Sequence, residues 1–239
     1  EVITLMFNIE LENKEYKLLC KNYSKNDGVK AIFLYLVIML VLFLQGYLYK
    51  TNLSPTILNV LQGIFSTLIL FIGLGFVLFS KEKLNTIGIT RKNLKQSLFY
   101  GILGATILII FIILFNKVIE GKKVVFLFPT ITTAITFIVT AISEEVVFRG
   151  YIQTRLTGLI QNNIITSCIN AFLFLSTHYP VRWAASGFSV TILSGFYVVC
   201  LILLHFVCDL VYRKTNCIWG SYLLHVLYNV FTSILIFSI

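Results

Sequence analysis

The chain has 239 residues, of which 58% are hydrophobic and only 12% are charged, and its mean hydropathy is +0.90. A soluble domain carries about 25% charged residues, so the composition excludes a soluble fold and predicts an all-α, polytopic bundle of transmembrane helices. The net charge of +9 does not indicate nucleic-acid binding, because the lysines and arginines lie in short connections between apolar runs, where positive charge sets membrane topology.

Residues 1–29 are polar and mixed in charge, and they are followed by a single predicted transmembrane domain, 30–239. A helix needs about 20 apolar residues to cross the hydrocarbon core of a bilayer. About seven runs approach this length, at roughly 30–49, 56–80, 96–116, 128–150, 163–178, 187–212 and 217–238. The fifth run is short and the sixth is long enough for one helix or two, so six to eight spans fit the sequence.

The positive charges predict an orientation for these spans. With the N-terminus inside, thirteen lysines and arginines fall on the N-terminal side of the membrane and five on the opposite side, with Arg149 left within a span. The positive-inside rule therefore predicts a multi-pass protein of the cell membrane with a cytoplasmic N-terminal segment, 1–29, and an external C-terminus. If the sixth run were two helices, the C-terminus would move to the cytoplasmic side.

The cysteines and two of the glycines are predicted to serve helix packing rather than chemistry. The five cysteines show no CxxC pattern, and four lie in or beside apolar runs, where a thiol behaves as a small hydrophobe. They predict neither a disulfide framework nor a cysteine-bound metal. Gly101 and Gly104 lie early in the third run, and small residues at this spacing let helices approach closely.

The fourth run contains the pattern Glu144-Glu145-x-x-x-Arg149. A charge near the bilayer centre costs about 2.5–3.5 kcal/mol on insertion scales and is commonly functional. On a helix Glu145 and Arg149 share a face and can pair, whereas Glu144 is rotated by about 100° and has no local partner. An unpaired, desolvated carboxylate suits a general base. Taken alone, the motif also fits a structural role in which both carboxylates pair across helices.

A second pattern, Phe174-x-x-x-His178, ends the fifth run. The phenylalanine lies one turn before the imidazole and can fix its rotamer. Tyr179-Pro180 then ends the helix, which leaves His178 at the end of a span beside a predicted cavity. A lone histidine in this place also fits a structural role.

The third pattern is His225-x-x-x-Asn229 in the last run. An imidazole and an amide on one helix face can both donate hydrogen bonds to a developing oxyanion, or can serve interhelical hydrogen bonding. His205, with Asp209 four residues later, imitates this pattern in the sixth run. We rank His205 second, because a turn rich in basic residues, 212–219, leads into the helix of His225.

These three patterns, in this order, resemble those of the CAAX protease and bacteriocin-processing family of intramembrane endopeptidases, which is related to the type II CAAX prenyl proteases. The resemblance covers about 84–239. It includes two softer features, the stretch Ile87-Gly88-Ile89-Thr90 and the turn Tyr212-Arg213-Lys214-Thr215-Asn216. It implies a helical bundle around a conical cavity that opens to the bilayer and the cytoplasm.

The resemblance also implies roles for individual residues. Glu144 would be the general base, His178 would orient the attacking water, and His225 with Asn229 would form the oxyanion hole. Three residues would support the site: Glu145, Arg149 and Phe174. The separation between His178 and His225 is long for the family, which predicts an insertion within 180–200 near the substrate entrance.

No cofactor is required by this scheme. The alternative is a zinc ion held by Glu144, His178 and His225, because two histidines and a carboxylate can form a catalytic zinc site. The sequence contains no His-Glu-x-x-His motif.

The predicted function is therefore an intramembrane endopeptidase that cleaves a lipid-anchored or hydrophobic peptide, in pheromone or bacteriocin maturation, in immunity or in CAAX-type processing. Its expected partners are the lipid bilayer and the peptide, and no nucleic acid. One alternative is a non-enzymatic immunity or regulatory protein that binds a peptide or a partner enzyme. Another is a proton-coupled transporter, because buried Glu and His also form proton relays, although transporters more often show inverted repeats and broken helices.

Overall fold

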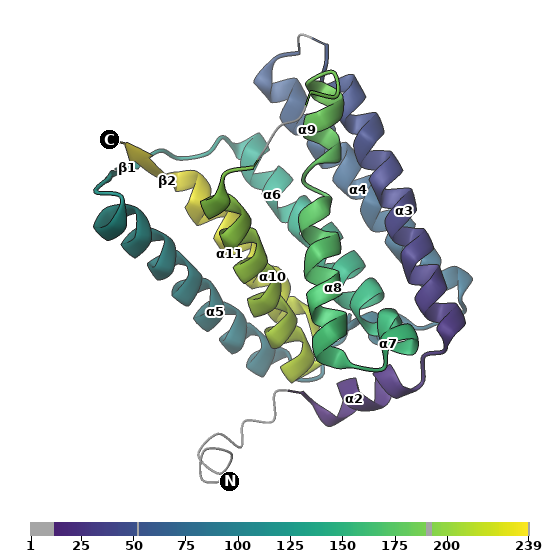
Figure 1. The fold of residues 1–239 in the computed structure, drawn as a ribbon. Coiled ribbons are helices and arrows are strands. Elements are labelled where there is room, and N and C mark those ends of the chain that lie inside the picture. The colour runs from purple at the N-terminus through teal and green to yellow at the C-terminus, as the bar shows by residue number, and fades with distance from the viewer. Residues whose placement is uncertain (1–11, 52, 190–192, 239) are drawn as a thin grey trace, which may run out of the picture.

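The computed structural model describes residues 12–51, 53–189 and 193–238, and they form a bundle of long helices (Figure 1). In chain order the elements are α2 (Lys14–Lys21), α3 (Lys25–Leu48), α4 (Pro55–Phe79), η1 (Leu84–Ile87), α5 (Leu94–Leu114), η2 (Phe115–Ile119), β1 (Lys123–Phe126), α6 (Ile131–Glu144), η3 (Glu145–Gln153), α7 (Thr154–Ile160), α8 (Asn163–Ser176), α9 (Pro180–Ala185), α10 (Gly195–Thr215), α11 (Ile218–Ile234) and β2 (Leu235–Ser238). The bundle has two ends. We call the end that carries α2 the α2 end, and the end where β1 pairs with β2 the β end (Figure 1).

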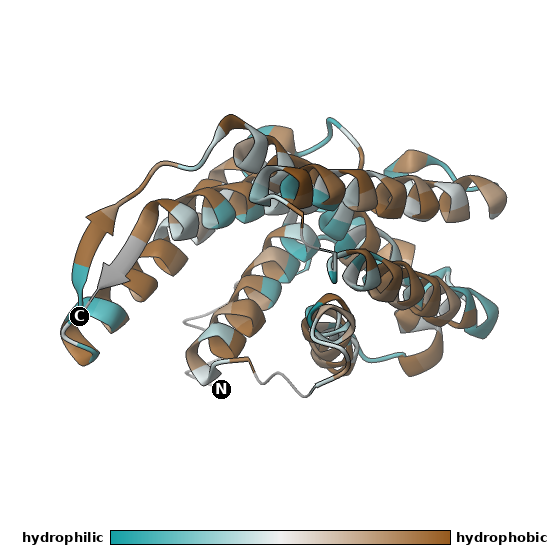
Figure 2. Ribbon diagram, turned by 90° about the horizontal axis from the view of Figure 1, so that it is seen from above, coloured by the Kyte–Doolittle hydropathy of each residue, from teal (hydrophilic) through white to brown (hydrophobic). Residues whose placement is uncertain are grey.

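Within the described residues, six helices are long and apolar enough to cross a membrane: Lys25–Leu48, Pro55–Phe79, Leu94–Ile119, Ile131–Ile160, Asn163–Ala185 and Gly195–Thr215. The seventh predicted span corresponds to α11, which has 17 residues and packs along α5 and α10. Apolar residues line the long helices (Figure 2), and large side chains such as Phe71, Phe99 and Ile107 are exposed on their outer faces. The prediction of a polytopic helical bundle is confirmed, and the chain is a multi-pass membrane protein.

Three predicted boundaries were wrong. The fourth span continues past residue 150 to Ile160, because η3 and α7 extend α6 without a break and bury their polar side chains among neighbouring helices. The sixth run, for which the sequence left one helix or two open, forms one helix, Gly195–Thr215, which begins eight residues later than predicted. The last helix ends at Ile234, because residues 235–238 pair with β1 as an antiparallel strand.

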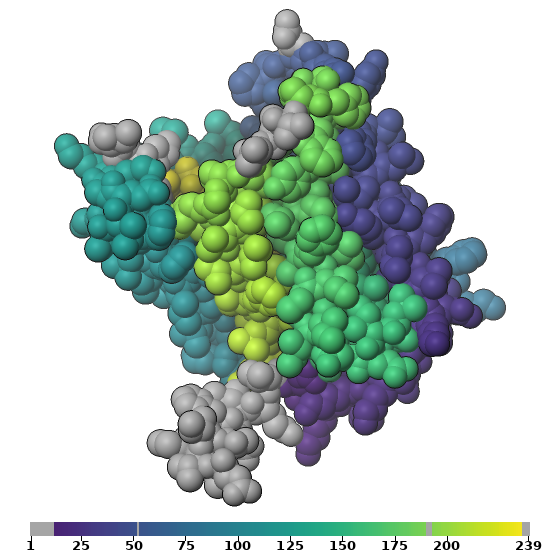
Figure 3. All heavy atoms as spheres, in the orientation of Figure 1, coloured from purple at the N-terminus to yellow at the C-terminus, as the bar shows by residue number. Residues whose placement is uncertain are grey.

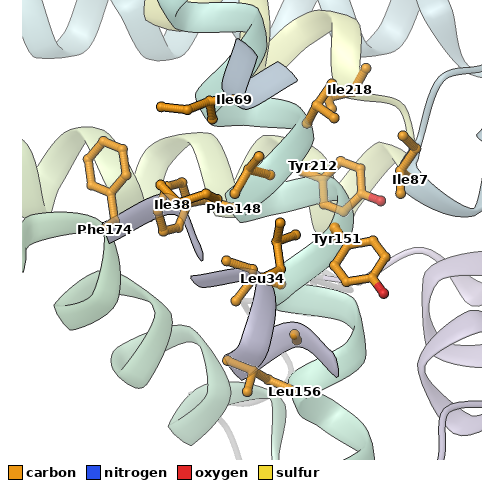
Figure 4. Close-up of a cluster of buried hydrophobic side chains, with 14 of the residues drawn as sticks. Leu34, Ile38, Ile69, Ile87, Phe148, Tyr151, Leu156, Phe174, Tyr212 and Ile218 are labelled. Carbon is orange, nitrogen blue, oxygen red and sulfur yellow. The ribbon is translucent and has the colours of Figure 1, made fainter. Parts of the chain in front are cut away.

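The core centres on η3, the segment that begins at the second glutamate of the Glu-Glu-Arg pattern. Phe148 and Tyr151 of η3 pack against Leu34 and Ile38 of α3 and against Tyr212 of α10 (Figure 4). Figure 3 shows α3 on one side of this face, α8 and α10 in the middle and α5 beside α10. The segment η3, which carries Glu145 and Arg149, is therefore enclosed by the rest of the bundle.

The stretch Ile87-Gly88 connects the start of the third span to this core. Gly88 ends η1 with φ of +77°, and a side chain there would collide with the Tyr212 ring. Its carbonyl accepts a hydrogen bond from the backbone N–H of Ile218 at 2.9 Å, at the first residue of α11. Ile87 is buried against Gly150. This stretch thus fixes α11 relative to η3.

Helices α5 and α11 approach closely at glycines, as the Gly101 pattern predicts. A side chain on Gly101 would collide with the Gly220 carbonyl, and one on Gly104 would meet Leu224. The buried Ser97 hydroxyl accepts a hydrogen bond from the Gly220 backbone N–H at 2.9 Å and donates one to the Cys217 carbonyl at 2.9 Å. The start of α11 is therefore held against α5 with no space for a larger residue.

Substituting Gly220→Ala should lower the free energy of unfolding by about 1–3 kcal/mol, the usual range for overpacking a tight contact. The new methyl group would collide with the Ser97 carbonyl. The matched control is Gly75→Ala in α4, where a side chain meets nothing within 4 Å. Thermal unfolding in detergent measures both variants, and equal midpoints for the two would show that the α5–α11 contact tolerates a methyl group.

Candidate active site

Glu144 is the last residue of α6. It lines a cavity of about 690 Å³ between α4, α5, α6, α10 and α11. His178, His225 and Asn229 line the same cavity. The side chain of Glu144 is 23% exposed. The structure thus brings together all four residues for which the sequence predicts a direct role.

Glu145 has a different environment from Glu144, as the rotation of about 100° between neighbouring helical residues predicts. Its side chain is fully buried, and its Oε1 lies 3.0 Å from Nη1 of Arg149 and 2.8 Å from Nδ1 of His225. The Arg149 guanidinium also stacks over the Phe174 ring, with its carbon 4.7 Å from the ring centroid. The second glutamate is therefore paired behind the cavity wall, while the first faces the cavity.

The backbone changes its pitch between these two glutamates. α6 ends at Glu144, and the π-helix η3 begins at Glu145. π-Helical segments are rare and occur frequently at functional sites. The sequence predicts a regular α-helix here, so the wider turn is a feature that the pattern of charges did not indicate.

His225 lies between the two glutamates. Its Nδ1 is hydrogen-bonded to Glu145, and its Nε2 is 3.6 Å from Oε2 of Glu144. Because the Glu145 carboxylate is an acceptor, Nδ1 carries the proton of this hydrogen bond. Nε2 is then the ring atom available to the cavity and to Glu144.

His178 is fixed by the residue one turn before it. α8 ends at Ser176, and Pro180 begins the short helix α9, so His178 lies in the turn between them. Its Nδ1 is 3.2 Å from the Phe174 carbonyl, and the two rings meet edge to face at 5.3 Å. Since a carbonyl only accepts, Nδ1 donates and Nε2 remains an acceptor. The predicted packing of Phe174 on His178 is confirmed.

His205, the competing histidine, does not line the cavity. It is fully buried, with its ring centroid 5.5 Å from that of Phe174, and its backbone carbonyl accepts a hydrogen bond from Arg149 at 3.4 Å. Asp209 pairs instead with Arg213 at 3.2 Å and with the Ser167 hydroxyl at 2.6 Å. The His205-x-x-x-Asp209 pattern therefore holds helices together away from the cavity.

A second, smaller cavity of about 180 Å³ also reaches Glu144 and His178. Gln62 and Ser66 of α4 line it, and Ser66 hydrogen-bonds to Thr140 of α6 at 2.8 Å. Gln62 lines both cavities, and Asn59 lines the larger one. Reasoning from the sequence missed these amides, although two amides in the apolar second run were a usable signal.

The described residues contain one group of potential metal ligands whose ligand atoms all lie within 4.8 Å of one another: Glu145, Cys208 and His225. The Arg149 guanidinium, 3.0 Å from Glu145, would repel a cation there. This group shares only His225 with the zinc set predicted from the sequence, Glu144, His178 and His225. That set remains a prediction for experiment.

Comparison with known protein families gives a match over part of the chain. The family model described as "Type II CAAX prenyl endopeptidase Rce1-like" matches residues 126–231, which include Glu144, His178, His225 and Asn229. The match is shorter than the 84–239 expected from the sequence patterns. No curated protein and no solved structure matches the chain.

Proposed function

We propose that this chain, whose residues 126–231 belong to the type II CAAX prenyl endopeptidase Rce1-like family, is an intramembrane endopeptidase that activates a water molecule with Glu144. The observation that carries the proposal is the division between the two glutamates. Glu145 is fully buried in its pair with Arg149, whereas Glu144 faces the cavity beside two histidines and an amide. A general base must be free to accept a proton from water, and Glu144 is the carboxylate placed to do so.

The first step is attack by water on the carbonyl carbon of the peptide bond. Glu144 accepts one proton from the water, while Nε2 of His178 accepts a hydrogen bond from it and orients it. Nδ1 of His178 donates to the Phe174 carbonyl, which keeps Nε2 in the acceptor state. The water oxygen forms a bond to the carbonyl carbon, and the carbonyl oxygen becomes the oxyanion.

The second step is stabilisation and collapse of the tetrahedral intermediate. The amide of Asn229 donates a hydrogen bond to the oxyanion. Nε2 of His225, 3.6 Å from Glu144, receives the proton that Glu144 took from the water and donates it to the oxyanion as a hydrogen bond. When the C–N bond breaks, this proton passes to the leaving amine. Glu145 fixes the His225 ring through Nδ1.

The cavity favours a hydrophobic or lipid-anchored peptide. Its volume of about 690 Å³ lies in the range of roughly 300–1,000 Å³ typical of ligand sites. Its lining includes the apolar side chains of Ile112, Phe196 and Leu204. Pheromone or bacteriocin maturation, immunity and CAAX-type processing all supply peptides of this class.

The test of this proposal is cleavage of a panel of membrane-associated peptides by the purified protein in detergent. We expect cleavage to be unchanged by a strong chelator, because the glutamate–water scheme uses no metal. Loss of cleavage with the chelator and its recovery with zinc would instead place Glu144, His178 and His225 in a metal site. Specific binding without cleavage of any peptide would favour the immunity or regulatory protein.

Asn229→Ala should lower kcat by about 10²–10³, with little change in KM, because an oxyanion donor acts mainly in the transition state. The matched control is Thr232→Ala, which removes a polar side chain from the same cavity but one that hydrogen-bonds the backbone of its own helix at 2.8 Å. Steady-state kinetics on the cleaved peptide measure both variants. An unchanged kcat for Asn229→Ala would remove Asn229 from the oxyanion hole.

A further inference from the structure

The catalytic cavity extends from Glu144 toward only one end of the bundle. Its lining includes Asn59 near the start of α4, Phe196 at the start of α10, Ser233 at the end of α11, and Lys122 beside β1. All of these positions lie toward the β end (Figure 1). Within the described part of the chain, no residue of α2, η1 or α7, which form the α2 end, lines the cavity. The cavity therefore opens at the β end.

The positive charges lie predominantly at the opposite end. At the α2 end the structure gathers thirteen of the nineteen lysines and arginines, on α2, at the start of α3, around η1, at and before the start of α5, in α7 and at the end of α10. Five lie at the β end: Lys50, Lys117, Lys122, Lys123 and Arg182. Several of the thirteen pair with acids, as Arg155 does with Glu82, but acidic residues contribute little to topology. The α2 end is therefore the cytoplasmic end.

The direction of the cavity and the distribution of positive charge, taken together, exclude a cavity that opens to the cytoplasm. Glu144 lies thirteen residues after the start of α6 at the β end, a depth of roughly 20 Å at 1.5 Å per residue. Sixteen further residues separate it from the end of this helix at Ile160, and buried side chains of η3 and α7 fill that distance. A substrate can reach Glu144 along the cavity from the β end, but not from the α2 end.

We infer that the cavity opens on the extracytoplasmic face of the membrane, and that the substrate is a hydrophobic or lipid-anchored peptide that has already crossed it. This inference rests on the proposed function for the cleavage step, but the sidedness stands on geometry and charge alone. An extracytoplasmic opening distinguishes this protein from an enzyme that processes the lipidated C-terminal tails of cytoplasmic proteins. The class of reaction that supplies the substrate is then export of the peptide precursor.

Sided cysteine labelling tests the orientation without any need for activity. The parent is Cys168→Ser, because Cys168 is exposed while the other four cysteines are buried. Burial raises the pKa of the Cys20 thiol at the α2 end to about 11, so this thiol stays protonated and reacts slowly. Two exposed lysines at opposite ends provide a matched pair, Lys123→Cys in β1 and Lys83→Cys before η1. Lys50→Cys and Lys92→Cys are the second pair, for use if either variant folds poorly.

In spheroplasts of a bacterial host, a membrane-impermeant maleimide should label Lys123→Cys at least tenfold more than Lys83→Cys, and permeabilisation should make the two equal. The reverse pattern would overturn the inference. A second readout is cleavage of an added reporter peptide by spheroplasts and by inside-out vesicles, each compared with Glu144→Gln. Cleavage by spheroplasts supports the inference, and cleavage only by vesicles contradicts it. If labelling gives the expected sides and neither preparation cleaves, the orientation holds and the proposed protease activity fails.

Discussion

Substituting Glu144→Gln should lower kcat for peptide cleavage by about 10²–10⁴, the contribution expected of a positioned general base. The amide has nearly the same shape as the carboxylate but cannot accept a proton from water. Glu144 has no ion pair with a lysine or arginine among the described residues, and its Oε2 lies 3.6 Å from Nε2 of His225. We therefore expect the fold of the variant to be unchanged.

Thermal unfolding and single-turnover kinetics on the same preparation separate the two effects. The matched control is Glu120→Gln, which removes a carboxylate near the β end that pairs with Lys122 and does not line the cavity. This control should retain cleavage within about twofold, as expected for a surface ion pair that contributes little. Full activity in Glu144→Gln would assign the base to another group, and His178 would be the next to test.

The sequence predicted the local surroundings of the site residues better than the end of the bundle toward which the cavity extends. The rotation of about 100° between neighbouring helical residues predicts different surroundings for Glu144 and Glu145, and this difference holds although η3 is a π-helix. The packing of Phe174 on His178 followed from a spacing of four residues. These predictions depend on contacts within one helix, which periodicity describes directly.

Contacts between helices could not be predicted from the periodicity of single helices. The hydrogen bond from Nδ1 of His225 to Glu145 at 2.8 Å joins residues eighty positions apart, and no pattern within one helix specifies such a pair. The amides Asn59 and Gln62 were visible as polar residues in an apolar run, but their place in the cavity wall depends on how α4 packs against α6.

The direction of the cavity shows the same limit. The sequence predicted a cytoplasmic N-terminus from its charges, while the family resemblance implied a cavity open to the cytoplasm. Both statements concern the two ends of the bundle, and their conflict emerges only when the cavity-lining residues are placed along their helices.

The largest expected loss of stability comes from Arg149→Met. Glu145 and Arg149 are both fully buried, with 3.0 Å between Oε1 and Nη1. Removing one partner of a buried ion pair leaves the other charge uncompensated and costs about 3–5 kcal/mol. Methionine keeps much of the side-chain volume and an apolar contact with the Phe174 ring. The loss should therefore report the charge rather than a cavity.

A double-mutant cycle with Glu145→Gln separates this charge effect from packing. The double variant buries neither charge, and glutamine keeps an oxygen that can accept the hydrogen bond from His225, which Glu145 accepts at 2.8 Å. We therefore expect the double variant to unfold at a higher temperature than Arg149→Met, with a coupling energy within the roughly 0.5–3 kcal/mol typical of contacting residues. Thermal unfolding in detergent measures all four proteins of the cycle. Additive losses would show that each side chain is needed for its shape, and that the pair is not the source of stability at the centre of η3.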